Sequence, residues 1–215
     1  MAAGLKIVVT LPLEENTAIV WAEGNSECVV IDPGLEPRKI LEEMQNAHLQ
    51  PVAFLCTHGH ADHVGGLGVL KQKFLDVPIY IGEKDADKLT NPAKNLSTDF
   101  GVPLVVPPAE VLLKGGETLT LAGMKINVFA TPGHSAGHCV FLFPEMTPPA
   151  VFVGDLIFYN SIGRSDFFDG DPLAQEKSIR DVIYTLPDDT ILHCGHGPST
   201  TVGIEKKTNP FLRGV

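Results

Sequence analysis

The chain has 215 residues, 44% of them hydrophobic, which is enough to bury the core of one globular domain of ordinary size. Its formal net charge of -10 argues against a general binding surface for nucleic acid or anionic membranes. We therefore expect a single domain over residues 1–215, with no nucleic-acid or membrane partner. The composition predicts no particular oligomeric state.

The cysteines are four in number and far apart in the sequence, at Cys28, Cys56, Cys139 and Cys194. This spacing argues against a disulfide framework or a thiolate zinc finger, and it suits a reducing cytoplasm. The N-terminal MAAGLKIVVTLPL has one lysine, a short apolar run and no small-residue cleavage pattern, so we interpret it as a first strand rather than a signal peptide. No apolar segment is long enough to span a bilayer. The expected location is the cytoplasm.

The N-terminal part of the chain alternates short β-branched runs with turn residues, which predicts strands at KIVVTL, TAIVWA and CVVID. A charged amphipathic helix is predicted over 37–47, with an apolar stripe of Ile40, Leu41 and Met44. VAFLCT follows as a buried strand. The next segment, which carries Leu67 and Leu70, is expected to be helical, and PIYIG to be another strand.

Residues 91–108 are rich in Pro, Asn, Ser and Thr and show no helical period, which predicts a long surface loop and a candidate for the rim of a site. ETLTLAG and MKINVFAT predict a hairpin, and CVFLF, AVFVGD and a final TILHCG predict further strands. A second helix is predicted from Pro172, with Asp171 as its N-cap and an apolar face of Ile179, Val182, Ile183 and Leu186. Strands occur in both halves and outnumber helices. We expect an α+β fold in which helices cover a sandwich of two sheets.

The segment FLCTHGHADHVGG places three histidines and one aspartate within six positions, where a predicted strand gives way to a helix. His58 and His60 are two apart on extended chain and project to the same side, while Asp62 and His63 can turn back toward them. A solvated histidine-rich loop is the alternative. Imidazole nitrogen and carboxylate oxygen are ligands for zinc, iron or manganese, and this density of them favours a metal site.

Three more candidate ligands follow apolar runs later in the chain, namely His134, Asp155 and His196. Sites gather where strands end at the rim of a sheet, so these distant segments have a physical reason to converge with the first cluster. Five imidazoles and two carboxylates suffice for two metal ions with four protein ligands each, provided that one carboxylate bridges. No thiolate is required.

The remaining histidines are assigned structural or surface roles. His48 ends an exposed helix, and His193 has the opposite strand parity from His196 and should face away. His138 is expected to be structural rather than a support of the ligands. Three of the cysteines flank ligands and are expected to pack as small buried hydrophobes, namely Cys56, Cys139 and Cys194. Arg164 either orients a substrate carboxylate or pairs with Asp166 or Asp169.

The succession T-H-x-H-x-D-H, T-P-G-H, G-D and G-H-G resembles the signature of the metallo-β-lactamase fold superfamily. Within it, GRSDF at 163–167, GHGPSTTVG and the tail TNPFLR look like the glyoxalase II-like hydrolases, and the resemblance covers essentially the whole chain. It implies a four-layer αββα sandwich and two divalent metal ions, with zinc expected and iron or manganese as alternatives. By the same resemblance the first metal is held by His58, His60 and His134, and the second by Asp62, His63 and His196, with Asp155 bridging.

The resemblance also implies an activity, the hydrolysis of a thioester like a hydroxyacylglutathione, or of a related ester, by a water activated between the two ions. Asp62 and Asp155 are the expected catalytic carboxylates, and Arg164 is the expected substrate anchor. True glyoxalase II proteins carry a basic helical extension beyond the position of Val215, and they have aromatic residues where this chain has Asp166 and Gly197-Pro198. We therefore expect loose selectivity for the thiol half of the substrate.

Other activities occur on the same fold. A mono-iron persulfide dioxygenase, an oxidoreductase, is the principal alternative, although GHGPS followed by TNPFLR favours the hydrolase branch. Zinc β-lactamases of the commonest class are expected to carry a cysteine where Asp155 stands, which argues against that activity. The acidic charge argues against a nuclease.

Overall fold

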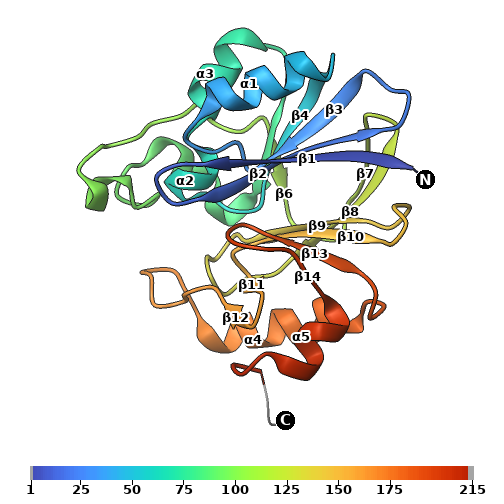
Figure 1. Cartoon of the computed structure of the whole chain (residues 1–215). Helices are drawn as coiled ribbons and strands as arrows, with labels where there is room; N and C mark the ends of the chain where they lie inside the picture. The colour runs from blue at the N-terminus through green and yellow to red at the C-terminus, as the bar shows by residue number, and fades with distance from the viewer. Residues whose placement is uncertain (1, 213–215) are drawn as a thin grey trace.

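The computed structural model describes residues 2–212 and contains two six-stranded sheets packed face to face. Figure 1 shows α1 (Pro37–Asn46) and α3 (Leu67–Lys73) on the outer face of one sheet. On the outer face of the other lie α4 (Pro172–Asp181) and α5 (Val202–Thr208). This arrangement confirms the four-layer αββα sandwich of the α+β class.

The first sheet has the order β1-β2-β3-β4-β5-β6. Its first three strands pair antiparallel as a meander, and β3 to β6 pair parallel through crossover connections. Because the crossovers place helices against the outer face, that face is covered and the parallel strands β3, β4 and β5 are largely buried. The strands are β1 (Ala3–Thr10), β2 (Glu15–Ala22), β3 (Glu27–Ile31), β4 (Gln50–Cys56), β5 (Ile79–Gly82) and β6 (Val111–Leu113).

The second sheet has the order β14-β13-β10-β9-β8-β7. Only β10 and β13 pair parallel in it, so their carboxyl ends lie at the same edge. The strands are β7 (Thr118–Leu121), β8 (Met124–Ala130), β9 (Cys139–Phe143), β10 (Ala150–Gly154), β13 (Ile191–Cys194) and β14 (Thr200–Thr201). A separate two-stranded sheet is formed by β11 (Ile157–Phe158) and β12 (Ser161–Ile162).

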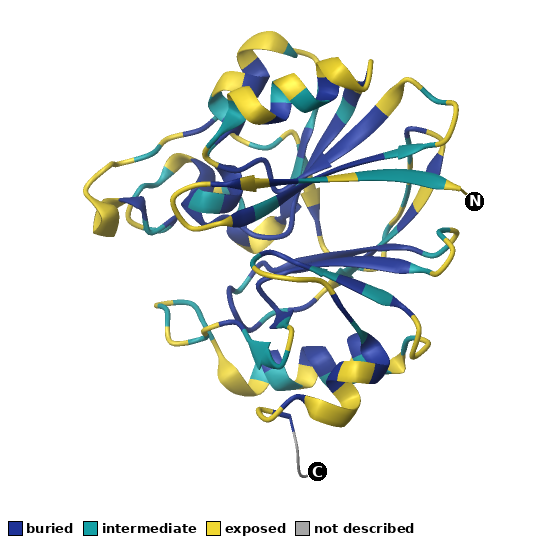
Figure 2. Ribbon diagram, in the orientation of Figure 1, coloured by how far each residue is buried: buried dark blue, intermediate teal, exposed yellow. Residues whose placement is uncertain are grey.

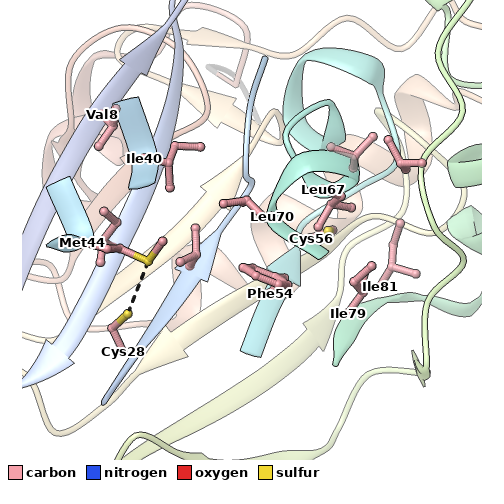
Figure 3. Packing of buried hydrophobic residues seen from close by; sticks show 14 of the residues in the cluster. Val8, Cys28, Ile40, Met44, Phe54, Cys56, Leu67, Leu70, Ile79 and Ile81 are labelled. Carbon is pink, nitrogen blue, oxygen red and sulfur yellow. Dashed lines mark hydrogen bonds between the residues drawn. The ribbon is translucent and has the colours of Figure 1, made fainter. Parts of the chain in front are cut away.

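Strand β4 illustrates how the layers are held together. Neighbouring side chains on a strand point to opposite faces, and Phe54 packs toward α1 and α3 while Leu55 packs between the sheets. Both are fully buried, which explains the unbroken apolar run of this strand. Figure 3 shows the outer cluster, in which Met44 of α1 reaches the Cys28 thiol with its sulfur at 4.0 Å. Figure 2 shows that the helices bury their inner faces and expose the outer ones.

The second half of the chain differs from expectation in two places. Helix α4 begins at Pro172 with the Asp171 carboxylate accepting from two backbone N–H groups, as predicted, but it ends at Asp181. Val182 caps the helix and the 3₁₀ helix η3 (Ile183–Thr185) follows it, with Ile183 buried. Val182 and Leu186 pack against the same core cluster as Ile179 and Ile183, so the predicted apolar face is formed although the helix is shorter. TILHCG is also not the final strand, because β14 and α5 follow it. At two and seven residues these elements are too short to show a clear period.

The predicted surface loop at 91–108 is more ordered than expected. The 3₁₀ helix η1 (Glu83–Thr90) precedes it, and η2 (Ser97–Phe100) lies within it. Asn95 is fully buried, and its amide donates to the carbonyls of Lys88 and Leu104, each at 3.0 Å. The Asn95 carbonyl accepts from the Ala61 N–H at 2.9 Å, at the start of α2 (Ala61–Val64). The loop therefore lies against the turn that carries the histidine cluster.

Candidate metal centre

The histidine-rich turn has the geometry that its sequence predicts. Strand β4 ends at Cys56, His60 is still extended at φ -73° and ψ 150°, and the single turn of α2 brings Asp62 and His63 back toward the strand end. Three imidazoles of this turn are buried, at His58, His60 and His63. Such burial is incompatible with a solvated histidine-rich loop.

His134 completes a first cluster with two histidines of the turn. Its Nε2 lies 3.2 Å from Nε2 of His58 and 3.0 Å from Nδ1 of His60. Burial lowers the pKa of each of these three imidazoles, so they are neutral at neutral pH. A neutral imidazole carries a hydrogen on only one of its two ring nitrogens. The three ring nitrogens that face one another here therefore cannot all be paired by hydrogen bonds. The donor set fits a cation, and imidazole is a preferred ligand of zinc and iron.

His196 forms a second cluster with the other two residues of the turn. Its Nε2 lies 3.2 Å from Oδ2 of Asp62 and 3.3 Å from Nε2 of His63. Burial lowers the pKa of His63, but the carboxylates of Asp155 and Asp62 outweigh it and hold that pKa well above its ordinary value. A metal ion that binds at the second cluster would therefore have to displace the proton of His63.

Asp155 lies between the two clusters. Its Oδ1 is 3.4 Å from Nε2 of His63, and its Oδ2 is 3.6 Å from Nε2 of both His134 and His196. Burial raises the pKa of this carboxyl, but the facing imidazole of His63 and its neighbours lower it far below the ordinary range, so it is ionised. A Cβ at Gly195 would lie 2.3 Å from Oδ1, so glycine there permits the close approach of the His196 loop.

Asp32 organises two of the histidines, and the sequence analysis missed it. Its Oδ2 accepts from Nδ1 of His63 at 3.1 Å and from the Thr57 hydroxyl at 2.7 Å, and Oδ1 accepts from the Thr57 N–H at 2.7 Å. The Thr57 hydroxyl oxygen in turn lies 3.0 Å from Nδ1 of His58, which can donate to it. Both rings are thereby fixed with Nε2 free to face the clusters. Asp32 follows a buried strand, as the candidate ligands do, and that signal could have identified it.

Backbone carbonyls support two more of the five histidines in the same way. Nδ1 of His134 donates to the Arg164 carbonyl at 2.6 Å, and Nδ1 of His196 donates to the Leu13 carbonyl at 3.0 Å. The structure thus brings together seven residues from four strand ends: His58, His60, Asp62, His63, His134, Asp155 and His196. Asp32 joins them from the end of a fifth strand, β3.

Arg164 lies beside the first cluster through its backbone, while its side chain points to solvent. The guanidinium donates twice to the Asp166 carboxylate, at 2.9 Å each, and its Cζ lies 4.8 Å from the centre of the Phe167 ring. The side chain is 70% exposed. Of the two alternatives for Arg164, the structure contains the ion pair with Asp166; Asp169 pairs with another cation.

The other histidines and the cysteines lie outside the ligand set. His138 is buried with Nδ1 bonded to the Thr131 hydroxyl at 2.9 Å, and His193 stacks on Phe152 away from the clusters. His48 is exposed. All four cysteines are free and buried, and burial raises each thiol pKa, to about 12 for Cys28, Cys139 and Cys194. They are therefore protonated and serve as packing residues, as predicted for Cys56, Cys139 and Cys194.

Residues 12–196 match the family model of the metallo-beta-lactamase superfamily, and the chain belongs to that family. It is a superfamily of metal-dependent hydrolases, and its fold binds divalent metal ions. The chain is 35% identical over 211 residues to the hydroxyacylglutathione hydrolase GloC of Haemophilus influenzae, covering 97% of each chain.

Among the described residues, no helix is long and apolar enough to cross a membrane.

Two solved structures resemble this one over nearly its whole length. The BLEG-1 B3 metallo-beta-lactamase is 35% identical with a TM-score of 0.93, covering 98% of this chain and 100% of its own. TTHA1623 in a di-iron-bound form is 39% identical with a TM-score of 0.83, covering 96% of this chain and 100% of its own.

Proposed function

We propose that the seven clustered residues hold two divalent metal ions. His58, His60 and His134 would bind the first ion, and Asp62, His63 and His196 the second. The observation that carries this assignment is the position of Asp155, whose carboxylate reaches imidazoles of both clusters at 3.4 to 3.6 Å. Zinc is the proposed metal because nitrogen and oxygen donors suit it, with iron or manganese as the alternatives. The di-iron form of TTHA1623 supports iron as an alternative.

The proposed reaction is hydrolysis of a thioester of the hydroxyacylglutathione kind, or of a related ester. When bound, two divalent ions acidify a water molecule and polarise a carbonyl oxygen. Asp62 is ionised, because the facing His63 outweighs the burial that would raise its pKa. It can accept a hydrogen bond from the attacking water and so orient it toward the carbonyl carbon. The name of the Haemophilus influenzae relative supports a thioester as the substrate.

Residues on one side of the centre suit a small organic substrate. The Phe167 ring lies 5.0 Å from the His60 ring and 5.4 Å from the His134 ring, and it forms an apolar wall beside the first cluster. Arg164 stands next to it at the surface, where its guanidinium could exchange Asp166 for a substrate carboxylate. Substrates with an anionic thiol half would use this contact, and neutral thioesters would not.

Hydrolysis of β-lactams is a second candidate. Position 155 is an aspartate, which argues only against the class of zinc β-lactamases that carry a cysteine there. The 35% identity and the TM-score of 0.93 to a protein described as a B3 metallo-beta-lactamase support this candidate. Attack of water on a lactam carbonyl would use the same carboxylates and the same histidines.

The test is a hydrolysis screen of the zinc-loaded protein on S-lactoylglutathione, a short neutral thioester, a lactone and a β-lactam. We expect turnover of the thioesters to exceed that of the β-lactam. His196→Ala should abolish it, while His193→Ala, three residues earlier on β13 and stacked on Phe152, should retain it. Oxygen uptake with glutathione persulfide by the iron-loaded protein, without thioester turnover, would instead assign a dioxygenase.

A further inference from the structure

Lys88 is a buried cation beside the first histidine cluster. It lies on η1, and only 1% of its side chain is exposed. Its Nζ is 3.2 Å from Oδ2 of Asp85 and 2.9 Å from Oδ2 of Asp169. Asp85 is also fully buried, so the three charges form a network inside the protein. A buried charge is costly unless it is paired, so the position of Lys88 depends on both carboxylates.

Asp85 ties together the two chain segments that carry the first cluster. Its Oδ2 accepts from the Gly59 N–H, between His58 and His60, at 2.9 Å. Oδ2 also accepts from the Ser135 hydroxyl at 2.8 Å, and Oδ1 accepts from the Gly137 N–H at 2.7 Å. Those two donors lie one and three residues after His134. One carboxylate thus sets the distance between the histidine-rich turn and the His134 loop.

Asp169 connects a third segment, the loop over residues 163–170. Besides Lys88, its Oδ2 accepts from the Ala136 N–H at 3.1 Å. The same loop holds the ring of His134 through the Arg164 carbonyl, and it places Phe167 against His60. The ring of Phe168 lies 5.7 Å from Lys88 Nζ. Lys88 is therefore the cation that joins this loop to the two segments held by Asp85.

We propose that Lys88, with Asp85 and Asp169, is a positioning element that fastens the loop 163–170 to the first histidine cluster. Without the cation, the carboxylates of Asp85 and Asp169 would face each other and repel. Asp85 would keep its three other donors and Asp169 would keep only the Ala136 N–H, so the loop carrying Asp169 would be the part that moves away. His134 would then lose its fixed orientation, which lowers the metal affinity of the cluster. Only this last consequence rests on the proposed metal centre.

The first experiment compares backbone hydrogen exchange of wild type, Lys88→Met, Asp169→Asn and the double variant. Lys88→Met keeps the length of the side chain and removes its charge. Both single variants should speed exchange within residues 163–170 by about tenfold or more, and the double variant should add little because both changes break one ion pair. Lys94→Met is the matched control, since it breaks the exposed Asp87–Lys94 pair nearby and should leave this loop unchanged.

The second experiment measures zinc affinity by competition with a chelator. It uses a His196→Ala background, so that the measured affinity is that of the first cluster alone. Loss of a group that orients a metal ligand weakens binding by about 10–100-fold, and we expect this range for Lys88→Met and Asp169→Asn but not for Lys94→Met. Unchanged exchange at 163–170 in Asp169→Asn would overturn the proposal, even if Lys88→Met fails to fold. Absence of zinc binding in the wild type would contradict the metal centre and leave the exchange comparison valid.

Discussion

The Asp32 carboxylate accepts a hydrogen bond from Nδ1 of His63 at 3.1 Å, although 30 residues separate the two in the chain. When His63 is neutral, as a metal ligand must be, the contact fixes its one hydrogen on the nitrogen that faces away from the centre. Its Nε2 is then left toward His196 and Asp155, at 3.3 and 3.4 Å. Asp32 also accepts from the Thr57 hydroxyl, which contacts His58. The Asp32 carboxylate therefore orients one histidine of each cluster.

Replacing Asp32 by Asn should therefore weaken both clusters. We expect the affinity for zinc to fall by about 10–100-fold at each, because the tautomers of His58 and His63 are no longer imposed. Thr57→Val removes the hydroxyl that links Asp32 to His58 but leaves the contact between Asp32 and His63, so it should weaken the first cluster more than the second. Chelator competition in His134→Ala and His196→Ala backgrounds would separate the clusters. Equal losses at both clusters in Thr57→Val would contradict the assignment.

Replacing Asp155 by Asn should act on turnover more than on substrate binding. The change removes the anionic oxygen shared by the two clusters while keeping the shape of the side chain. We expect kcat for a thioester to fall about 100-fold or more, with KM little changed. The measurement is steady-state kinetics with metal content determined on the same sample. Near wild-type kcat at full loading would mean that Asp155 does not bridge.

Metal binding at the two clusters should depend differently on pH. The pKa of His63 is held well above its ordinary value, so this residue is protonated at neutral pH and must lose its proton to bind a metal. Burial lowers the pKa of His196, but the hydrogen bond to Asp62 and the charge of Asp155 raise that pKa above its ordinary value as well. The zinc affinity of the second cluster should therefore fall by at least about tenfold for each unit by which the pH decreases. Burial lowers the pKa of His58, His60 and His134, so the first cluster should be nearly independent of pH around 7. Titrations of His134→Ala and His196→Ala from pH 6 to 8 test this; equal slopes would refute it.

Arg164 and Asp166 offer a paired test of substrate recognition. The guanidinium is engaged by Asp166 through two hydrogen bonds. Asp166→Asn should free it and lower KM for S-lactoylglutathione severalfold, and Arg164→Ala should raise that KM. Neither change should affect KM for a neutral thioester. A low KM that depends on the glutathione carboxylates but ignores Arg164→Ala would place glutathione recognition elsewhere in the chain.

Much of the centre could be predicted because its residues follow a simple rule of position. His134, Asp155 and His196 each come just after an apolar strand, and the strand ends meet at one edge of the sandwich. Asp32 obeys the same rule after β3 but has no histidine beside it, so its local sequence does not distinguish it from any other carboxylate at a turn. The density of imidazole, rather than strand position alone, made the other ligands recognisable.

The charged network of Lys88 could not be predicted from its local sequence. In EKDADKLT, two aspartates and two lysines lie among few apolar residues, which is typical of a solvated surface segment. Only the packing of the loops after His134 and around Asp169 encloses Asp85 and Lys88. Such burial depends on tertiary contacts between distant segments. The short α5 was missed for a related reason, since its seven residues are held mainly by tertiary packing.

The central claim is that seven residues hold two metal ions with Asp155 between them. The most direct measurement is anomalous diffraction, recorded above and below the zinc edge, from crystals of the zinc-loaded wild type, His134→Ala and His196→Ala. We expect two anomalous peaks in the wild type, loss mainly of the first in His134→Ala and mainly of the second in His196→Ala. A single fully occupied ion in the wild type in excess zinc, with His63 and His196 not bound to metal, would contradict the claim.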